Sequence, residues 1–316
     1  GDFFEFSIQK VQPLVSIIVI TYNSEKYVLE TLESARAQTY QNIELIVSDD
    51  GSKDNTVEIC RKWIEENKNR FVRTELITVE KNTGVTANCN RGLLAAHGEW
   101  IKYVAGDDIL VNFCIEEFLN AVNDKIKIIC SEIKEFRLDH EAKIEISEKG
   151  SIVNPAFIKL HEARKQFNYF LKGFYIPGSG LFLERNKLID LDGFDERYRN
   201  SEIRPLLLKY TYNNIRIHYL PCILVFHRRH PGAVTAKTDR IIALYLKEAY
   251  EAIRYYSKFC GNILLKINAI WHIWLIKLIF SAGNRGTLCN LLNSIRLNLQ
   301  PLRINNLLVR AHLLSE

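Results

Sequence analysis

The chain has 316 residues, which is long enough for a full hydrophobic core in one large domain, or in one domain with an appendage. Apolar residues make up 47% and charged residues 25%, as in ordinary globular proteins, and a net charge of +5 is too small to indicate nucleic-acid binding. The basic excess lies at the end: residues 240–316 carry 10 Lys and Arg against 3 Asp and Glu, whereas residues 1–239 carry 32 against 34.

The seven Cys are an odd number without a closely spaced pair, which argues against a disulfide framework and a structural zinc site. The first residues lack a basic stretch followed by an apolar run, so we expect no signal peptide. Both features favour a cytoplasmic protein with reduced thiols.

Strands and helices alternate over roughly the first 130 residues, which indicates an α/β fold: a doubly wound, mostly parallel central sheet flanked by helices. The apolar, β-branched run 15–21 is typical of a strand that is buried on both faces. The pattern predicts strands at 15–21, 43–48, 72–79, 99–104 and 126–131, and helices at 24–38, 55–66, 83–97 and 109–122.

Beyond this alternation, residues 134–173 are less regular, and we expect them to cover the sheet and shape a cleft. From residue 238 the pattern is helical. We therefore predict a main α/β domain over residues 1–237 and a C-terminal helical region over residues 238–316.

Polar residues stand where four predicted strands end, and ligands of open α/β sheets bind at the carboxyl ends of the strands. Bland interpretations exist for each group: core packing for Tyr22, a turn for Asp49-Asp50, and loop or cap chemistry for Asn82 and Asn88. Tyr22 could also stack on a base beside an Asp that accepts a base N–H. The candidates at the first three ends are Thr21, Tyr22, Asn23, Asp49, Asn82, Gly84 and Asn88.

Asp107-Asp108 is the fourth such group. Two adjacent carboxylates repel each other, and burial raises the cost unless a cation compensates. Mg²⁺ or Mn²⁺ carrying diphosphate oxygens would do so. The alternative is a pair of capping residues for a helix that begins at Ile109.

A basic cluster, His227-Arg-Arg-His230, follows an apolar strand. A solvated charge run is its default interpretation. Because a diphosphate and a metal need cationic and imidazole groups nearby, we predict that Arg229 contacts the diphosphate-bearing ligand and that His230 is a metal ligand beside Asp107 and Asp108. A dinucleotide-binding GxGxxG, a P-loop and a Gly-x-Ser-x-Gly elbow are all missing from the sequence.

Taken in order, these motifs resemble the family 2 glycosyltransferases, inverting enzymes with the GT-A fold, over about residues 13–232. The resemblance implies a nucleotide-diphosphate sugar donor, usually a UDP-sugar, and Mn²⁺ or Mg²⁺. It implies that Tyr22 packs on the uracil, that Asp49 accepts its N3–H and that residues 82–88 line the pocket. Asp107-Asp108 would contact the ribose and hold the metal, although Ala105 replaces the first Asp of the common Asp-x-Asp-Asp form.

The resemblance extends to Gly193-Phe-Asp-Glu, which precedes the Glu-Asp motif of the family. The Asp of that motif is the expected general base, but here Glu202 matches the Glu and Ile203 takes the Asp position. Either Glu202 is the base, or omitted residues have shifted the register of this Met-free sequence, or activity is impaired. Impaired activity would leave a sugar-nucleotide-binding or scaffold protein of the same fold.

The tail segment 263–280 is strongly apolar but contains Lys266, His272 and Lys277, so it is a poor candidate for a membrane span. Its basic stripe and its tryptophans fit a helix that lies in a membrane interface. A helix packed on the main domain, or on a second copy in a homodimer, fits as well. A membrane site at the inner face of the cytoplasmic membrane would suit a saccharide acceptor carried on a lipid diphosphate, as the family often uses in surface polysaccharide synthesis.

Overall fold

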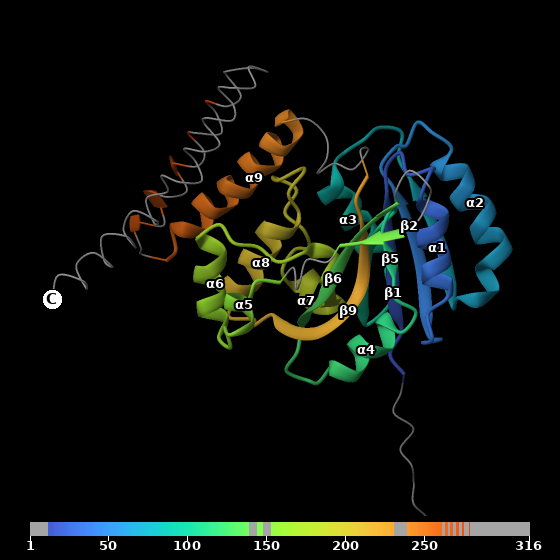
Figure 1. The fold of residues 1–316 in the computed structure, drawn as a ribbon, viewed down its shortest axis with the longest axis horizontal. Helices are drawn as coiled ribbons and strands as arrows, with labels where there is room; N and C mark the ends of the chain where they lie inside the picture. The colour runs from blue at the N-terminus through green and yellow to red at the C-terminus, as the bar shows by residue number, and fades with distance from the viewer. Residues whose placement is uncertain are drawn as a thin grey trace, which may run out of the picture.

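The computed structural model of the chain describes residues 12–138, 144–147, 153–230 and 239–260, with single residues of a helix between 263 and 278. One mixed sheet runs through the centre, and helices cover both of its faces (Figure 1). In the described ranges the sheet has nine strands, in the order β3-β2-β1-β4-β8-β6-β9-β5, with β7 paired to β6.

The first half of the sheet is parallel, as the sequence predicts. It consists of β1 (Val15–Thr21), β2 (Ile43–Asp49), β3 (Arg73–Thr78) and β4 (Trp100–Ala105). Because all four strands run the same way, their carboxyl ends share one edge. The predicted α/β fold with a central sheet flanked by helices is confirmed, whereas the outer strands are mixed in direction.

Alternate side chains of β1 enter two separate cores. Ile17 packs with residues of α1 (Val28–Arg36) and α2 (Thr56–Asn67), whereas Ile18 packs against α3 (Val85–Ala95) on the opposite face. This burial on both faces is why the strand contains a continuous apolar run.

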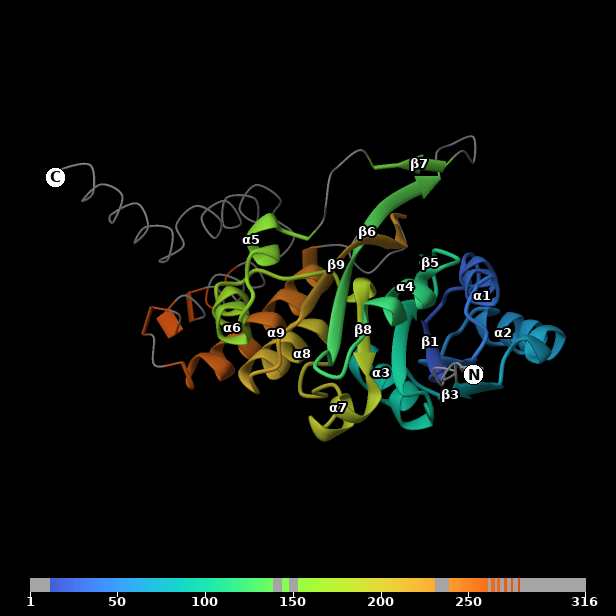
Figure 2. The ribbon, with the colours of Figure 1, turned by 90° about the horizontal axis from the view of Figure 1, so that it is seen from below.

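The second half of the sheet is mixed in direction, and its two longest strands run the same way as the first half. β8 (Leu181–Glu184) pairs antiparallel with both β4 and β6 (Ile128–Leu138), and β6 pairs parallel with β9 (His218–Arg228). β6 and β9 reach past the rest of the sheet. There β7 (Ile144–Ile146) pairs antiparallel with the end of β6 (Figure 2).

The predicted helix 109–122 is wrong at its start. Ile109 and Leu110 form the short strand β5, paired antiparallel with Phe226 and Val225 of β9, and α4 begins only at Cys114 (Cys114–Ala121). Two apolar residues are compatible with a strand as well as with a helix, and here the pairing with β9 makes them a strand. Asp107-Asp108 therefore does not cap a helix, and β5 brings these carboxylates beside the end of β9.

The remaining helices lie beyond β8 and β6: α5 (Pro155–Ile158), α6 (Ala163–Leu171), α7 (Arg185–Asp190), α8 (Ile203–Tyr212) and α9 (Asp239–Ser257). Short 3-10 turns occur at η1 (Lys68–Arg70) and η2 (Gly178–Gly180). α9 packs on α6 and α8, and its Tyr250, Ile253 and Tyr256 enter the core that also holds α3. The predicted boundary at 237/238 lies outside the described residues and stays a prediction.

Candidate functional site

The carboxyl ends of β1, β2 and β4 are tied together by main-chain hydrogen bonds. The N–H of Asp50 donates to Thr21 (3.0 Å) and the N–H of Gly106 donates to Ile20 (2.9 Å). The turns that follow β2 and β4 thus lie on either side of the end of β1, so three of the predicted polar groups gather at one edge.

Asp49 organises the turn after β2. Its Oδ1 accepts the N–H groups of Gly51 (3.0 Å) and Ser52 (2.8 Å), and its Oδ2 accepts the hydroxyls of Thr21 (2.8 Å) and Ser52. A carboxylate has about four acceptor positions, so all of them are taken. The predicted contact with a uracil N3–H stays a prediction, and it requires one of these bonds to open.

Asp50 links this turn to the loop before α3. Its Oδ1 accepts from the N–H of Thr83 (3.0 Å) and from Arg91 Nη2 (2.7 Å), and its Oδ2 accepts the N–H of Gly84 (2.8 Å). Asp50 and Arg91 are not among the site residues predicted from the sequence. The spacing of Arg91, one helical turn after Asn88, was the available signal.

The loop 82–86 is also fixed from the far side by Arg199. Arg199 Nη2 donates to the carbonyl and to Oδ1 of Asn82, both at 2.8 Å. Gly84 has φ +103°, and a Cβ there would lie 2.2 Å from Cγ of Arg199. This close approach explains the glycine, and it joins the predicted nucleotide loop to the segment that leads to Glu202.

Tyr22 and Asn23 lie at the open end of β1. The Tyr22 side chain is 45% exposed, so its ring is available to a ligand. Asn23 has φ +52°, its Oδ1 accepts the N–H of Lys53 (2.8 Å), and its N–H donates to Ser52 Oγ (2.7 Å). Asn23 is exposed, and its two hydrogen bonds tie the turn after β2 to the end of β1.

Asn88 is buried and acts as a brace. Its Nδ2 donates to the carbonyl of Ser48 (2.9 Å), and its Oδ1 accepts from Ser48 Oγ (2.6 Å) and Arg91 Nη2 (3.0 Å). Like Asp49, it supports the predicted pocket from behind.

Asp107 and Asp108 each meet a histidine from the end of β9. Asp107 Oδ2 lies 3.0 Å from Nε2 of His230, and Asp108 Oδ1 lies 2.9 Å from Nδ1 of His227. Asp108 is buried and also accepts the N–H of Arg228 (3.1 Å). His230 thus lies beside Asp107, and its predicted role as a metal ligand stays a prediction; His227, from the same basic cluster, was not among the predicted site residues.

Charge and burial oppose each other in these pairs. Burial, together with the charge of Asp108, raises the pKa of Asp107, against the opposing effect of His230. Burial acts to lower the pKa of His227, but the hydrogen bond and charge of Asp108 outweigh it, so the pKa of His227 is raised. The ionised form of Asp107 is therefore disfavoured, and a cation beside its carboxylate would relieve this.

Arg228 anchors the end of β9 to the rest of the site. Its Nε donates to the carbonyl of Asp107 (2.9 Å), its Nη2 pairs with Glu30 (2.8 Å), and its guanidinium lies between the rings of Tyr27 and Phe136. The neighbouring Arg229 points elsewhere and pairs with Glu135 of β6. The predicted contact of Arg229 with the nucleotide therefore stays a prediction, and it would require this ion pair to open.

Glu202 lies at the start of α8, on the far side of loop 82–86. Burial raises the pKa of its carboxyl to about 7, and the charge of Glu248 on α9 adds to the rise. Its neighbour Ile203 fills the space beside Gly178, where a Cβ would lie 2.4 Å from Ile203 Cγ1. Ile203 is thus a packing residue, and Glu202 carries the ionisable group of this segment.

The residues at Asp107 fit a metal that takes few ligands from the protein. Within the described part of the chain no group of three or more His, Cys, Asp and Glu converges on one point. The Asp107 carboxylate and the His230 imidazole do converge, and Mg²⁺ characteristically binds one or two carboxylates together with substrate phosphates and water.

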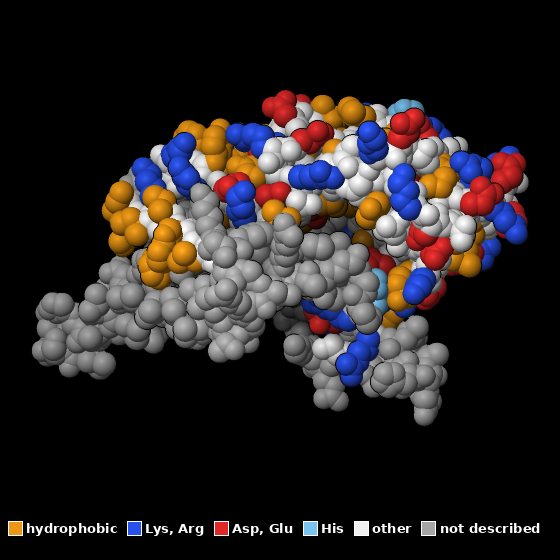
Figure 3. Space-filling view, turned by 90° about the horizontal axis from the view of Figure 1, so that it is seen from above, with side chains coloured by type: hydrophobic (Ala, Val, Ile, Leu, Met, Phe, Trp, Pro, Cys, Tyr) orange, Lys and Arg blue, Asp and Glu red, His pale blue; other side chains and the backbone are white. Residues whose placement is uncertain are grey.

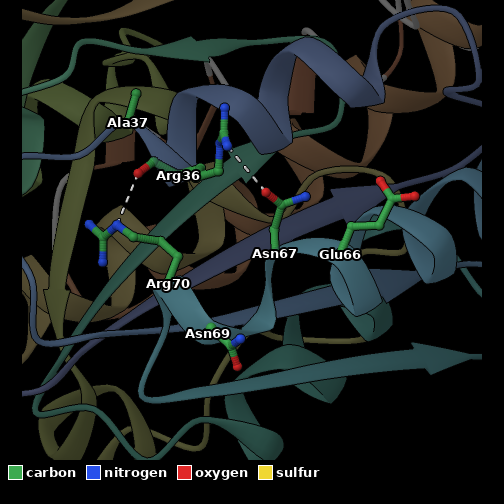
Figure 4. A pocket seen from close by; sticks show the side chains of 6 residues that line it. All are labelled: Arg36, Ala37, Glu66, Asn67, Asn69 and Arg70. Carbon is green, nitrogen blue, oxygen red and sulfur yellow. Dashed lines mark hydrogen bonds between the residues drawn. The ribbon is translucent and has the colours of Figure 1, made fainter.

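The hollow of about 450 Å³ between α1, α2 and η1 is not part of this site. Arg36, Asn67 and Arg70 line it, with Arg70 Nε donating to the carbonyl of Arg36 (3.0 Å) (Figure 4). It lies at the C-terminal ends of α1 and α2, which is the edge of the sheet opposite the carboxyl ends of the parallel strands.

A sequence profile described as Glycosyl transferase family 2 matches residues 16–190, more than half of the chain. This chain belongs to that family. The match covers β1 to α7, and it stops before Glu202, His227 and His230.

Curated relatives of this family 2 chain match over its first part. Glycosyltransferase GlyG of Streptococcus pneumoniae is 38% identical over 112 residues, 35% of this chain and 36% of GlyG. Putative glycosyltransferase EpsH of Bacillus subtilis is 36% identical over 125 residues, 39% of this chain and 35% of EpsH. The matched part thus spans little more than a third of each relative.

Solved structures share the fold of the family 2 chain. S. aureus TarS 1-349 in complex with UDP-GlcNAc has a TM-score of 0.60 at 20% identity, covering 82% of this chain and 70% of that one. Mannosyltransferase PcManGT from Pyrobaculum calidifontis, in complex with GDP-Man and Mn²⁺, has a TM-score of 0.57 at 17% identity, covering 93% and 83%. The fold is therefore that of GT-A glycosyltransferases.

Proposed function

We propose that this chain is an inverting, metal-dependent glycosyltransferase that moves a sugar from a UDP-sugar to a saccharide or lipid-linked acceptor in surface polysaccharide synthesis. The observation that carries the proposal is the meeting of the 49–52 turn, the 82–86 loop and the Asp107–His230 pair at one edge of the sheet. The family match and the nucleotide-sugar complexes of TarS and PcManGT support it.

Each side chain then has a role. The exposed ring of Tyr22 stacks on the uracil, the 82–86 loop lines the nucleotide pocket, and Asp107 with His230 holds Mn²⁺ or Mg²⁺. When bound, the metal would offset the charge of the leaving diphosphate. Asp108 is buried against His227, so it orients that histidine and the end of β9.

Glu202 is the proposed general base, which takes the proton of the acceptor hydroxyl as its oxygen attacks the anomeric carbon. A base works best when its pKa is near the operating pH, and burial raises the pKa of Glu202 to about 7. Activity should therefore be complete above this pKa and fall as the pH drops through it, because the protonated carboxyl cannot accept a proton.

We also propose that the protein works at the inner face of the cytoplasmic membrane. Ile263, Ile267, Ile270 and Trp274 are all exposed, at 63, 44, 54 and 52%. At 100° per residue they fall within about 60° of one another on a helix, and the surrounding region is basic. Hydrophobic side chains also gather at this end of the molecule in Figure 3. Within the described residues no helix is long and apolar enough to cross a bilayer.

One second candidate, a sugar-nucleotide-binding scaffold without turnover, is favoured by Ala105 and Ile203 at positions where the family motifs place Asp. A homodimer built through the tail is a further proposal that the exposed stripe supports equally.

The test combines binding with turnover. We expect UDP to raise the melting temperature more than GDP does, and Mn²⁺ to enlarge the UDP shift. A panel of UDP-sugars, beginning with UDP-GlcNAc, should then give slow UDP release with water as acceptor. Binding without release from any donor would favour the scaffold, and no shift with either nucleotide would overturn the proposed donor site.

A further inference from the structure

Glu248 on α9 accepts two hydrogen bonds from the turn that precedes Glu202. Its Oε2 accepts the main-chain N–H of Asn200 (2.6 Å), and its Oε1 accepts Nδ2 of the same residue (2.8 Å). Both oxygens thus hold one residue at two points, which fixes its main chain and its side chain together. Asn200 lies two positions before Glu202 and directly after Arg199.

The same turn is held on its other side by the loop 82–86 and the start of α3. Arg199 donates to Asn82, and the N–H and the hydroxyl of Thr86 donate to the carbonyl of Arg199 (3.4 and 3.3 Å). The turn is therefore held between α9 and α3.

We propose that Glu248 is a positioning residue for the acceptor base: it fixes Asn200, and through that turn it sets where the Glu202 carboxyl lies and how much negative charge it faces. The proposal rests on the role of Glu202 given above. In the described part of the chain no Lys, Arg or His pairs with Glu202 or Glu248, so the charge of Glu248 is not neutralised by an ion pair.

Other ionisable groups also face Glu202, and they must be kept constant. Tyr245 of α9 and Cys89 of α3 interact with its charge. Burial raises the pKa of both groups, so they stay neutral near pH 7. Glu248 is then the charged neighbour that raises the pKa of Glu202 after burial itself.

The test uses the full chain with ¹³C-labelled Glu. The Glu202 carboxyl signal is assigned by its loss in Glu202→Gln, and its titration midpoint should lie near 7 in the unchanged protein. Glu248→Gln keeps the shape but removes the charge and turns an amide NH₂ toward the donors of Asn200. We expect the midpoint to fall by at least about half a pH unit. Glu251→Gln is the matched control, because Glu251 lies on the same helix and pairs with Lys247 (3.8 Å). In this variant the titration midpoint of Glu202 should not change.

Turnover separates positioning from charge. With the donor that the panel selects, Glu248→Gln should lower kcat about tenfold at constant KM, and move the acid limb of the rate profile to lower pH. Glu248→Asp keeps the charge but shortens the reach, so it should lower kcat with the acid limb in place. Equal midpoints in the Gln variants at 248 and 251 would overturn the inference. Unchanged UDP release in Glu202→Gln would instead overturn the proposed base, and leave the measured coupling standing.

Discussion

The proposed donor side of the site, with Asp49 and Asp50, and the proposed acceptor side, with Glu202, hold their carboxylates in opposite ways. Asp49 and Asp50 accept several hydrogen bonds each from residues close in the fold, and Arg91 neutralises Asp50. Glu202 has no cationic partner among the described residues and faces the charge of Glu248. Asp49 and Asp50 therefore build a fixed, hydrogen-bonded frame, whereas burial raises the pKa of Glu202 to about 7. Binding a charged donor needs a rigid frame, and moving a proton needs a carboxyl that can change its charge.

The largest expected effect comes from removing the half-buried carboxylate of Asp107, the proposed metal ligand. Asp107→Asn should lower UDP release by about a hundredfold or more, because the amide cannot balance a cation on the diphosphate. The rate should be measured across a range of Mn²⁺ concentrations. Asp124→Asn, in the exposed turn after α4, is the control. If Asp107→Asn keeps the full rate at every Mn²⁺ concentration, the metal does not bind there.

The second largest effect tests the contact between the two sides, in which Gly84 of the loop 82–86 packs against Arg199. Gly84→Ala should lower the free energy of unfolding by about 1–3 kcal/mol and weaken the UDP-induced thermal shift, because it combines a positive φ with a clash against Arg199. Gly173→Ala is the matched control: φ is +92°, but its Cβ would approach only the hydroxyl of Tyr250, at 3.3 Å. A UDP shift that survives in Gly84→Ala would show that the loop is not part of the pocket. The comparison is made by chemical denaturation and thermal shift.

The smallest expected effect concerns the proposed membrane-binding surface, which includes Ile267 and Trp274 and lies outside the donor and acceptor sides. Replacing Ile267 or Trp274 by Ser should weaken binding to vesicles of anionic lipid by roughly fivefold each, about 1 kcal/mol of apolar burial. Leu94→Ser removes an even more exposed apolar side chain from α3, and it should leave vesicle binding unchanged. Cosedimentation with anionic and neutral vesicles measures both. Binding that is indifferent to the Ser variants would favour the dimer, which sedimentation of the protein alone would reveal.

The donor side was more open to sequence reasoning than the acceptor side. Buried strands followed by polar residues predict the shared edge, because parallel strands end together, and the structure confirms that Asp49, Gly84 and Asp107 gather there. The sequence did not predict which strands pair or which side chains contact each other. Nothing in the local pattern shows that Ile109 and Leu110 pair with β9, and so the contact of Asp108 with His227 could not be derived.

The acceptor side depends on contacts that local patterns do not encode. Glu248 reads as one more charged residue on an amphipathic helix, and only the packing of α9 on α8 places it at Asn200. In the same way, the full use of both Asp49 oxygens is a matter of turn geometry. Motifs predict which residue types a site needs, but not which of them are already occupied by the protein itself.

The two-residue strand β5 also bears on the order in which the molecule forms. Its partner in β9 lies more than a hundred residues later in the chain, with Ile109 opposite Phe226. During synthesis the parallel strands are complete long before β9 emerges, and pairing over such a sequence distance is slow because a long loop must be closed first. Until then Asp107 and Asp108 have no histidine beside them. We therefore expect the nucleotide site to be among the last parts of the fold to mature, and a folding intermediate with an intact parallel sheet to be unable to bind UDP.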